Sequence, residues 1–119
     1  MESLNATLLS ALIAVESGGQ INAIGDNGRA VGVLQIHACC VEDVNRITGK
    51  TYTLQDRTDE AKSREICTAY LLHYGRVYER RTGEKATAEI LARIWNGGPR
   101  GHKKNSTLHY WGRVQSVME

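Results

Sequence analysis

The chain has 119 residues, a formal charge of +2 and the composition of an ordinary globular protein, which predicts one domain over residues 1–119. Its lysines and arginines are interleaved with acids and form no run, so the charge does not indicate a nucleic-acid-binding protein. No leader follows Met1 and no apolar stretch approaches about 18 residues, so we expect neither leader-directed secretion nor insertion into a membrane.

A first helix is predicted over residues 5–16, with Asn5 as its N-cap and Gly18 beyond its end. Glu16 falls in the last turn, on the side where the apolar residues lie. The carbonyl end of a helix and partial burial both disfavour a charged carboxylate, so we expect the pKa of Glu16 to be raised. Such a group suits general acid catalysis, whereas a surface glutamate on a differently rotated helix is the ordinary alternative.

The next segments contain a turn signal and a second helical pattern. Residues 23–32 are predicted to form a small hairpin, because the Asn-Gly pair at 27–28 accepts positive φ. Helical periodicity then predicts a helix over residues 34–49, with a break near 39–40. Residues 51–57 are predicted to be a loop.

Three further segments complete a mainly α (α+β) helical bundle with one short β-hairpin. A long helix is predicted over residues 59–78 and another over 86–95, the latter stopped by Asn-Gly-Gly-Pro. Residues 100–105 are predicted to be a basic loop. Ser106 or Thr107 is the expected cap of the last helix.

The cysteines are an odd number, Cys39, Cys40 and Cys67, which argues against a disulfide framework and favours a reducing compartment. A zinc site that also uses His37 and His73 is not expected, because the spacing matches no standard pattern. Cys67 lies on the apolar face of its helix, where a thiol packs as a small hydrophobe. We therefore expect no metal and no cofactor.

Four motifs, taken in order, resemble those of the soluble lytic transglycosylase and goose-type lysozyme families. They are Glu16-Ser17 before a hairpin, Gly-Val-Leu-Gln at 32–35, Ala-Arg-Ile-Trp-Asn-Gly-Gly at 92–98, and Tyr-Trp at 110–111. Each motif is weak alone, and together they are fairly specific. The small size and the lack of a leader look most like the peptidoglycan-degrading domains of bacteriophages.

The resemblance implies a lysozyme-like fold and cleavage of the β-1,4 bond between N-acetylmuramic acid and N-acetylglucosamine. It implies that Glu16 is the catalytic acid and that Ser17 and Gln35 support this acid and the wall of the cleft. Asn96 and Gly97 match the loop that touches the N-acetyl group of the sugar.

The resemblance also implies roles for three further positions, each with an alternative. Tyr110 matches the family tyrosine whose hydroxyl lies near the acid, although Trp111 is also a candidate for this aromatic. Trp95 replaces a tyrosine of many transglycosylases, which keeps an aromatic platform for the sugar and removes a hydroxyl. His37 occupies a place where goose-type enzymes tend to have an aspartate. A polar residue of the cleft wall or a helix cap is the ordinary interpretation, and a residue that positions water is the alternative.

Asp26 decides between two mechanisms. The resemblance to the goose-type hairpin makes Asp26 the base of an inverting hydrolase, whose two carboxyl groups lie about 6.5–9.5 Å apart. An aspartate beside Asn-Gly is also favoured in any turn. The alternative is a lytic transglycosylase, in which Glu16 acts alone and the C6 hydroxyl of muramic acid closes a 1,6-anhydro ring. A non-catalytic glycan-binding module is the third possibility.

The implied partner is the glycan strand of bacterial peptidoglycan, and we expect a bacteriolytic monomer that binds no nucleic acid. The expected location is the host cytoplasm until release to the cell wall, or the virion.

Overall fold

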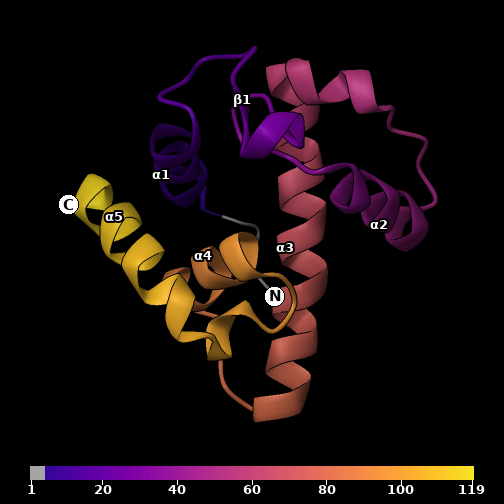
Figure 1. Cartoon of the computed structure of the whole chain (residues 1–119). Helices are drawn as coiled ribbons and strands as arrows, with labels where there is room; N and C mark the ends of the chain where they lie inside the picture. The colour runs from indigo at the N-terminus through magenta and orange to yellow at the C-terminus, as the bar shows by residue number, and fades with distance from the viewer. Residues whose placement is uncertain (1–4) are drawn as a thin grey trace. The chain divides into compact units, whose positions relative to one another are not determined.

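The computed structural model describes residues 5–119, which form two compact units (Figure 1). The central unit is Ile13–Tyr70, and the terminal unit consists of residues 5–12 with Leu71–Glu119. Helices α1 (Ala6–Glu16) and α3 (Glu60–Thr82) each contribute residues to both units. The described chain has five α-helices and one two-stranded sheet, which confirms the predicted mainly α fold with a short hairpin.

The first helix begins and ends as predicted. The Asn5 side chain accepts a hydrogen bond from the Thr7 backbone N–H at 2.6 Å and so caps α1. The helix ends at Glu16, and Gly18 follows with a φ of 66°. This left-handed conformation costs a glycine little and stops the helix.

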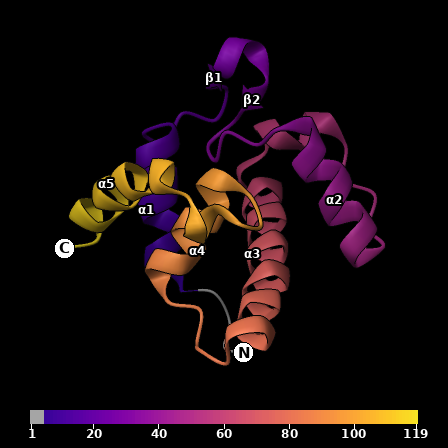
Figure 2. The same cartoon turned by 60° about the horizontal axis from the view of Figure 1, so that its bottom comes forward.

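The predicted hairpin is also confirmed. Strands β1 (Ile24–Gly25) and β2 (Ala30–Val31) are antiparallel, and a single 3-10 turn, η1 (Asp26–Gly28), joins them. Figure 2 shows this turn at the tip of the hairpin. Within the turn, Asn27 and Gly28 have φ values of 57° and 88°, as the Asn-Gly signal predicts.

Helix α2 (Ala38–Thr48) begins later than predicted, and the predicted break near residues 39–40 is absent. Residues 32–35 form a turn instead, and Val31 and Ile36 form an antiparallel bridge. Gln35 explains the error, because its φ of 52° is incompatible with a right-handed helix. The predicted end is correct, since Gly49 is left-handed with a φ of 74°.

The segment predicted as a loop at 51–57 contains a 3-10 helix, η2 (Leu54–Thr58). A reciprocal capping box of Thr53 and Asp56 stabilises its start. Asp59 then caps α3 by accepting from the Lys62 N–H at 2.9 Å. Helix α3 continues past residue 78 to Thr82. No helix of the described chain combines the length and apolar character needed to span a bilayer.

In the terminal unit, Thr87 caps α4 (Ala88–Gly97). The predicted basic loop contains two 3-10 turns, η3 (Gly101–Lys103) and η4 (Asn105–Thr107), and α5 (Leu108–Met118) follows. Helix α4 packs against η3 and α5 (Figure 2).

Each unit has its own set of buried apolar side chains. Those of the central unit are Ile13, Ala30, Val33, Leu34, Ile36, Val41, Val44, Ile66, Cys67 and Tyr70. Those of the terminal unit are Leu8, Leu9, Ala11, Leu12, Leu71, Ala86, Leu91, Ala92, Ile94, Tyr110 and Val114. Among the described residues, the buried polar ones are Ser63 and Thr107, one in each unit.

Candidate active site

Glu16 is the last residue of α1, and its side chain is half-buried. It lies at the carbonyl end of the helix, as predicted. Its charge acts electrostatically on the buried thiol of Cys67. Burial raises the pKa of Cys67 well above its ordinary value, and the charges of Cys40 and Glu16 raise it further. The candidate acid therefore lies near the core of the central unit.

Ser17 fixes the chain directly after Glu16. Its hydroxyl donates to the carbonyl of the buried residue Val33 at 2.8 Å and accepts from the Gly19 N–H at 3.0 Å. These bonds join the end of α1 to the turn at residues 32–35. The role of Ser17 in supporting the acid stays a prediction.

Gln35 joins the same turn to the hairpin. Its side-chain amide donates to the carbonyls of Ala23 at 3.1 Å and Gly32 at 3.0 Å. Gly25 makes room for this side chain, since a Cβ there would lie 2.4 Å from Gln35 Oε1. The Gln35 side chain therefore connects the two segments that flank the hairpin.

Asp26 lies at the start of the hairpin turn, and its carboxylate is 47% exposed. Its Oδ1 is 3.3 Å from Arg29 Nη2, and its Oδ2 is 3.4 Å from His37 Nε2. The carboxylate is thus held on two sides and remains open to solvent. His37 occupies the N-cap position of α2, and its side chain makes no cap hydrogen bond there.

Backbone strain concentrates at this site. In the part of the chain that the structure describes, the non-glycine residues with positive φ are Asp26, Asn27 and Gln35. Left-handed backbone in non-glycine residues is uncommon and tends to persist where function requires it. Two of the three are residues predicted from the sequence to serve the reaction.

Arg57 supports the hairpin and was missed in the sequence. Its guanidinium donates to the carbonyls of Leu54 at 2.9 Å and Ile36 at 3.1 Å. Its own carbonyl accepts from the buried Ser63 hydroxyl at 3.0 Å. A Cβ on Gly32 would lie 1.8 Å from that carbonyl oxygen, so only glycine fits there. An arginine in a predicted loop gave no signal of this role.

The remaining predicted residues belong to the terminal unit. Asn96 and Gly97 end α4, and Asn96 is exposed. Trp95 is half-buried, whereas Tyr110 of α5 is buried. The structure therefore groups Trp95, Asn96, Gly97 and Tyr110 in the terminal unit, and Glu16, Ser17, Asp26, Gln35 and His37 in the central unit.

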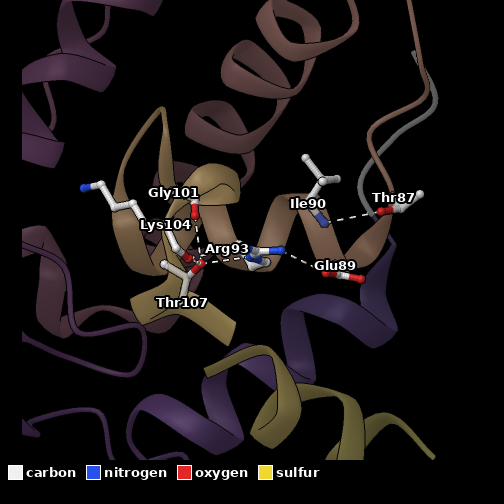
Figure 3. Close-up of polar contacts among 7 residues, drawn as sticks. All are labelled: Thr87, Glu89, Ile90, Arg93, Gly101, Lys104 and Thr107. Carbon is white, nitrogen blue, oxygen red and sulfur yellow. Dashed lines mark hydrogen bonds and ion pairs between the residues drawn. The ribbon is translucent and has the colours of Figure 1, made fainter. Parts of the chain in front are cut away.

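Arg93 organises the loop after α4, as Figure 3 shows. Its guanidinium donates to Glu89 Oε2 at 3.0 Å, to Thr107 Oγ1 at 2.9 Å and to the Lys104 carbonyl at 3.2 Å. Of the two predicted caps, Thr107 occupies the N-cap position of α5, but its side chain makes no cap bond. Its hydroxyl instead lies 2.8 Å from the Gly101 and Lys104 carbonyls. Arg93 lies within the motif at residues 92–98, but no feature of the motif indicates this role.

The three cysteines differ in exposure. Cys39, Cys40 and Cys67 are free, and burial, with the neighbouring Cys39 and Asp43, raises the pKa of Cys40 to about 12. The described residues contain no group of three or more His, Cys, Asp or Glu side chains arranged to hold an ion.

Solved lysozyme structures resemble this fold along almost the whole chain. A chain in the crystal structure of Aeromonas hydrophila PliI in complex with Meretrix lusoria lysozyme matches with a TM-score of 0.79 and 28% identity, covering 96% of this chain and 90% of that one. The crystal structure of Tapes japonica lysozyme matches with a TM-score of 0.77 and 26% identity, covering 95% of this chain and 89% of that one.

Curated relatives match over shorter stretches. Lysozyme 1 of Crassostrea virginica is 51% identical over 39 residues, which are 33% of this chain and 21% of the relative. Lysozyme of Meretrix lusoria is 44% identical over 45 residues, or 38% of this chain and 37% of the relative. These matches thus span well under half the length of either relative.

The model of one protein family covers nearly the entire sequence. It is described as the transglycosylase SLT domain and matches residues 1–113. The match confirms the lysozyme-like superfamily predicted from the motifs, while the likeness to bacteriophage domains stays a prediction. The chain belongs to the transglycosylase SLT domain family.

Proposed function

We propose that this protein is a peptidoglycan-degrading glycosidase that cleaves the β-1,4 bond between N-acetylmuramic acid and N-acetylglucosamine, with Glu16 as the general acid. The observation that carries the proposal is the position of Glu16, half-buried at the carbonyl end of α1 and fixed by the Ser17 hydroxyl at 2.8 Å from the Val33 carbonyl. Both the helix end and the partial burial favour a carboxyl group that holds its proton until it is needed. The lysozymes among its relatives support the same chemistry.

In the hydrolytic mechanism that we favour, Glu16 donates its proton to the glycosidic oxygen as the bond to C1 breaks. Asp26 accepts a proton from the water that attacks C1 from the opposite face, so the configuration inverts. The open carboxylate of Asp26, on a strained turn between Arg29 and His37, supports this role. Ser17, Gln35, His37, Trp95, Asn96, Gly97 and Tyr110 are the proposed substrate-binding residues.

A lytic transglycosylase is the second candidate, and the description of the family model favours it. Here Glu16 first protonates the leaving oxygen and then, as a carboxylate, takes the proton of the C6 hydroxyl, whose oxygen attacks C1. Asp26 would then serve only the turn. The two reactions give products that differ by one water, since hydrolysis yields a reducing muramic end and transglycosylation an anhydro end.

The test combines turbidity clearing of purified sacculi with mass spectrometry of the products. Glu16→Gln keeps the shape but removes the acid, so we expect activity to fall about 100-fold or more. Glu42→Gln, on the exposed face of α2, is the matched control and should retain full activity. Undiminished lysis by Glu16→Gln would exclude the proposal, and a wild-type chain that binds sacculi without clearing them would indicate a glycan-binding module. We further propose that the protein acts as a monomer.

A further inference from the structure

The loop after α4 lies directly against the end of that helix. A Cβ on Gly101 would be 2.0 Å from the Arg93 carbonyl oxygen, and one on Gly97 would be 2.6 Å from Thr107 Cγ2. Both glycines are therefore required by close contact between helix and loop, because neither has a positive φ. The position of the loop and the position of the Asn96-Gly97 pair depend on each other.

Lys104 is the residue of this loop that contacts the pair. Its ammonium donates to the Gly97 carbonyl at 2.7 Å, and a Cβ on Gly97 would lie 3.5 Å from Lys104 Cδ. The stem of the lysine thus lies along Gly97, and its charge ends on a carbonyl of the last helical turn. Such carbonyls lack partners within the helix, and a cation is favoured beside them.

The backbone of Lys104 is itself held in place, which gives the contact a fixed geometry. Its carbonyl accepts from Arg93 Nη2 at 3.2 Å and lies 2.8 Å from the hydroxyl of Thr107, a residue that is 1% exposed (Figure 3). Glu89 holds Arg93 from the other side at 3.0 Å. The fixed backbone limits the directions that the Lys104 side chain can take, while the ordering of its rotamers still costs entropy.

We propose that Lys104 is a positioning residue for the substrate. Its ammonium fixes the Gly97 peptide, and thereby sets the orientation in which Asn96 and Gly97 receive the N-acetyl group of the sugar. This inference rests on the proposed function. Lys104 contacts Gly97 rather than the reacting atoms, so it affects substrate binding and leaves the proton transfers of Glu16 unchanged.

The test uses soluble, uncrosslinked peptidoglycan strands, with cleavage followed by mass spectrometry. Lys104→Met keeps the apolar stem and removes the donor, so we expect KM to rise about tenfold while kcat changes less than about twofold. Lys103→Met is the matched control, since it removes the same charge from the neighbouring exposed residue, and it should leave both constants unchanged. Lys104→Arg, which restores a cationic donor, should recover most of the loss.

The outcomes separate the two proposals. If the wild type cleaves the strands and the KM of Lys104→Met equals that of the wild type, the positioning role is wrong and the proposed function stands. If Lys104→Met and Lys103→Met raise KM equally, the effect is one of charge alone, which also excludes the role. If the wild type neither cleaves nor binds the strands, the proposed function fails and this inference fails with it. Circular dichroism at the assay temperature confirms that each variant is folded.

Discussion

Single hydroxyl groups hold the segments on which the candidate site depends. Ser17 joins the end of α1 to the turn that carries Gln35, and Thr107 joins α4 to its following loop. The carbonyl of Val33 accepts from the Ser17 hydroxyl, whereas the Lys104 carbonyl beside Thr107 also accepts from Arg93 Nη2. Removing the Ser17 hydroxyl therefore takes the donor from the Val33 carbonyl, which costs more than the bond itself contributes.

We expect Ser17→Ala to lower the free energy of unfolding by about 1–2 kcal/mol, because the carbonyl of the buried residue Val33 loses its donor. Urea unfolding measures this change. Ser10→Ala is the control, since Ser10 is exposed on α1 and its replacement should change stability by less than about 0.5 kcal/mol. Equal effects of the two substitutions would show that the bond to Val33 contributes nothing.

His102 provides a test by pH. Burial lowers its pKa below the ordinary value of 6.5, and the charges of Lys103, Arg93 and Arg100 lower it further. Its Nδ1 is buried without a hydrogen-bond partner, and its ring meets Tyr78 edge-on at 4.9 Å between centroids. A proton on Nδ1 therefore has neither solvent nor an acceptor beside it.

Because the folded state disfavours the protonated ring, the unfolded chain takes up the proton first as the pH falls. The stability contribution of His102 is complete above pH 6.5 and declines as the pH falls towards the lowered pKa. Urea unfolding of wild type and His102→Gln at a series of pH values should show a steeper loss for the wild type below this pH. NMR titration of the ring gives the pKa directly, and a value at or above 6.5 would contradict the assignment.

At the scale of elements, the contact between α4 and its loop is the tightest feature of the terminal unit. Gly101→Ala places a methyl group 2.0 Å from a backbone oxygen that cannot move alone, so we expect a loss of at least about 2 kcal/mol. Gly112→Ala in α5 meets nothing within 4 Å and should stabilise the chain by about 0.5–1 kcal/mol. Thermal unfolding distinguishes the two, and similar midpoints would refute the close approach.

The sequence predicted the ends of helices and the hairpin turn well. It did not predict the conformation of the irregular segments. Asn5, Gly49 and the Asn-Gly turn each act through their own backbone preferences, so the sequence reveals them. Gln35 adopts a left-handed conformation because distant carbonyls receive its side chain, and no local pattern shows this. The helix expected over 34–49 was therefore placed too early.

Across the whole chain, the motifs predicted the candidate site residues. They did not predict the side chains that hold these residues in place. Glu16, Asp26 and Asn96 belong to segments that resemble a family, and the resemblance identified them. Arg57 and Arg93 donate mainly to groups distant in sequence, and such partners are known only after the chain has folded. The motifs therefore indicate candidate residues, and the fold shows which other side chains hold their segments in place.

The three cysteines allow a measurement on the intact protein. Cys39 is exposed, whereas Cys67 is buried and burial raises the pKa of Cys40 to about 12. Because the thiolate is the reacting form, we expect a maleimide at about pH 8 to add rapidly to Cys39 alone, and to all three in denaturant. Mass spectrometry counts the additions. Fast addition at Cys67 in the native protein would contradict its burial.

The left-handed backbone of Asp26 gives position 26 two conflicting requirements. Glycine adopts the φ of 50° with least strain, so Asp26→Gly should be more stable than Asp26→Ala by about 1 kcal/mol in urea unfolding. If Asp26 is the base, both variants lose hydrolysis equally despite this difference. Selection for stability alone would favour glycine at position 26. Selection for the activation of water would keep the aspartate, although its backbone is strained.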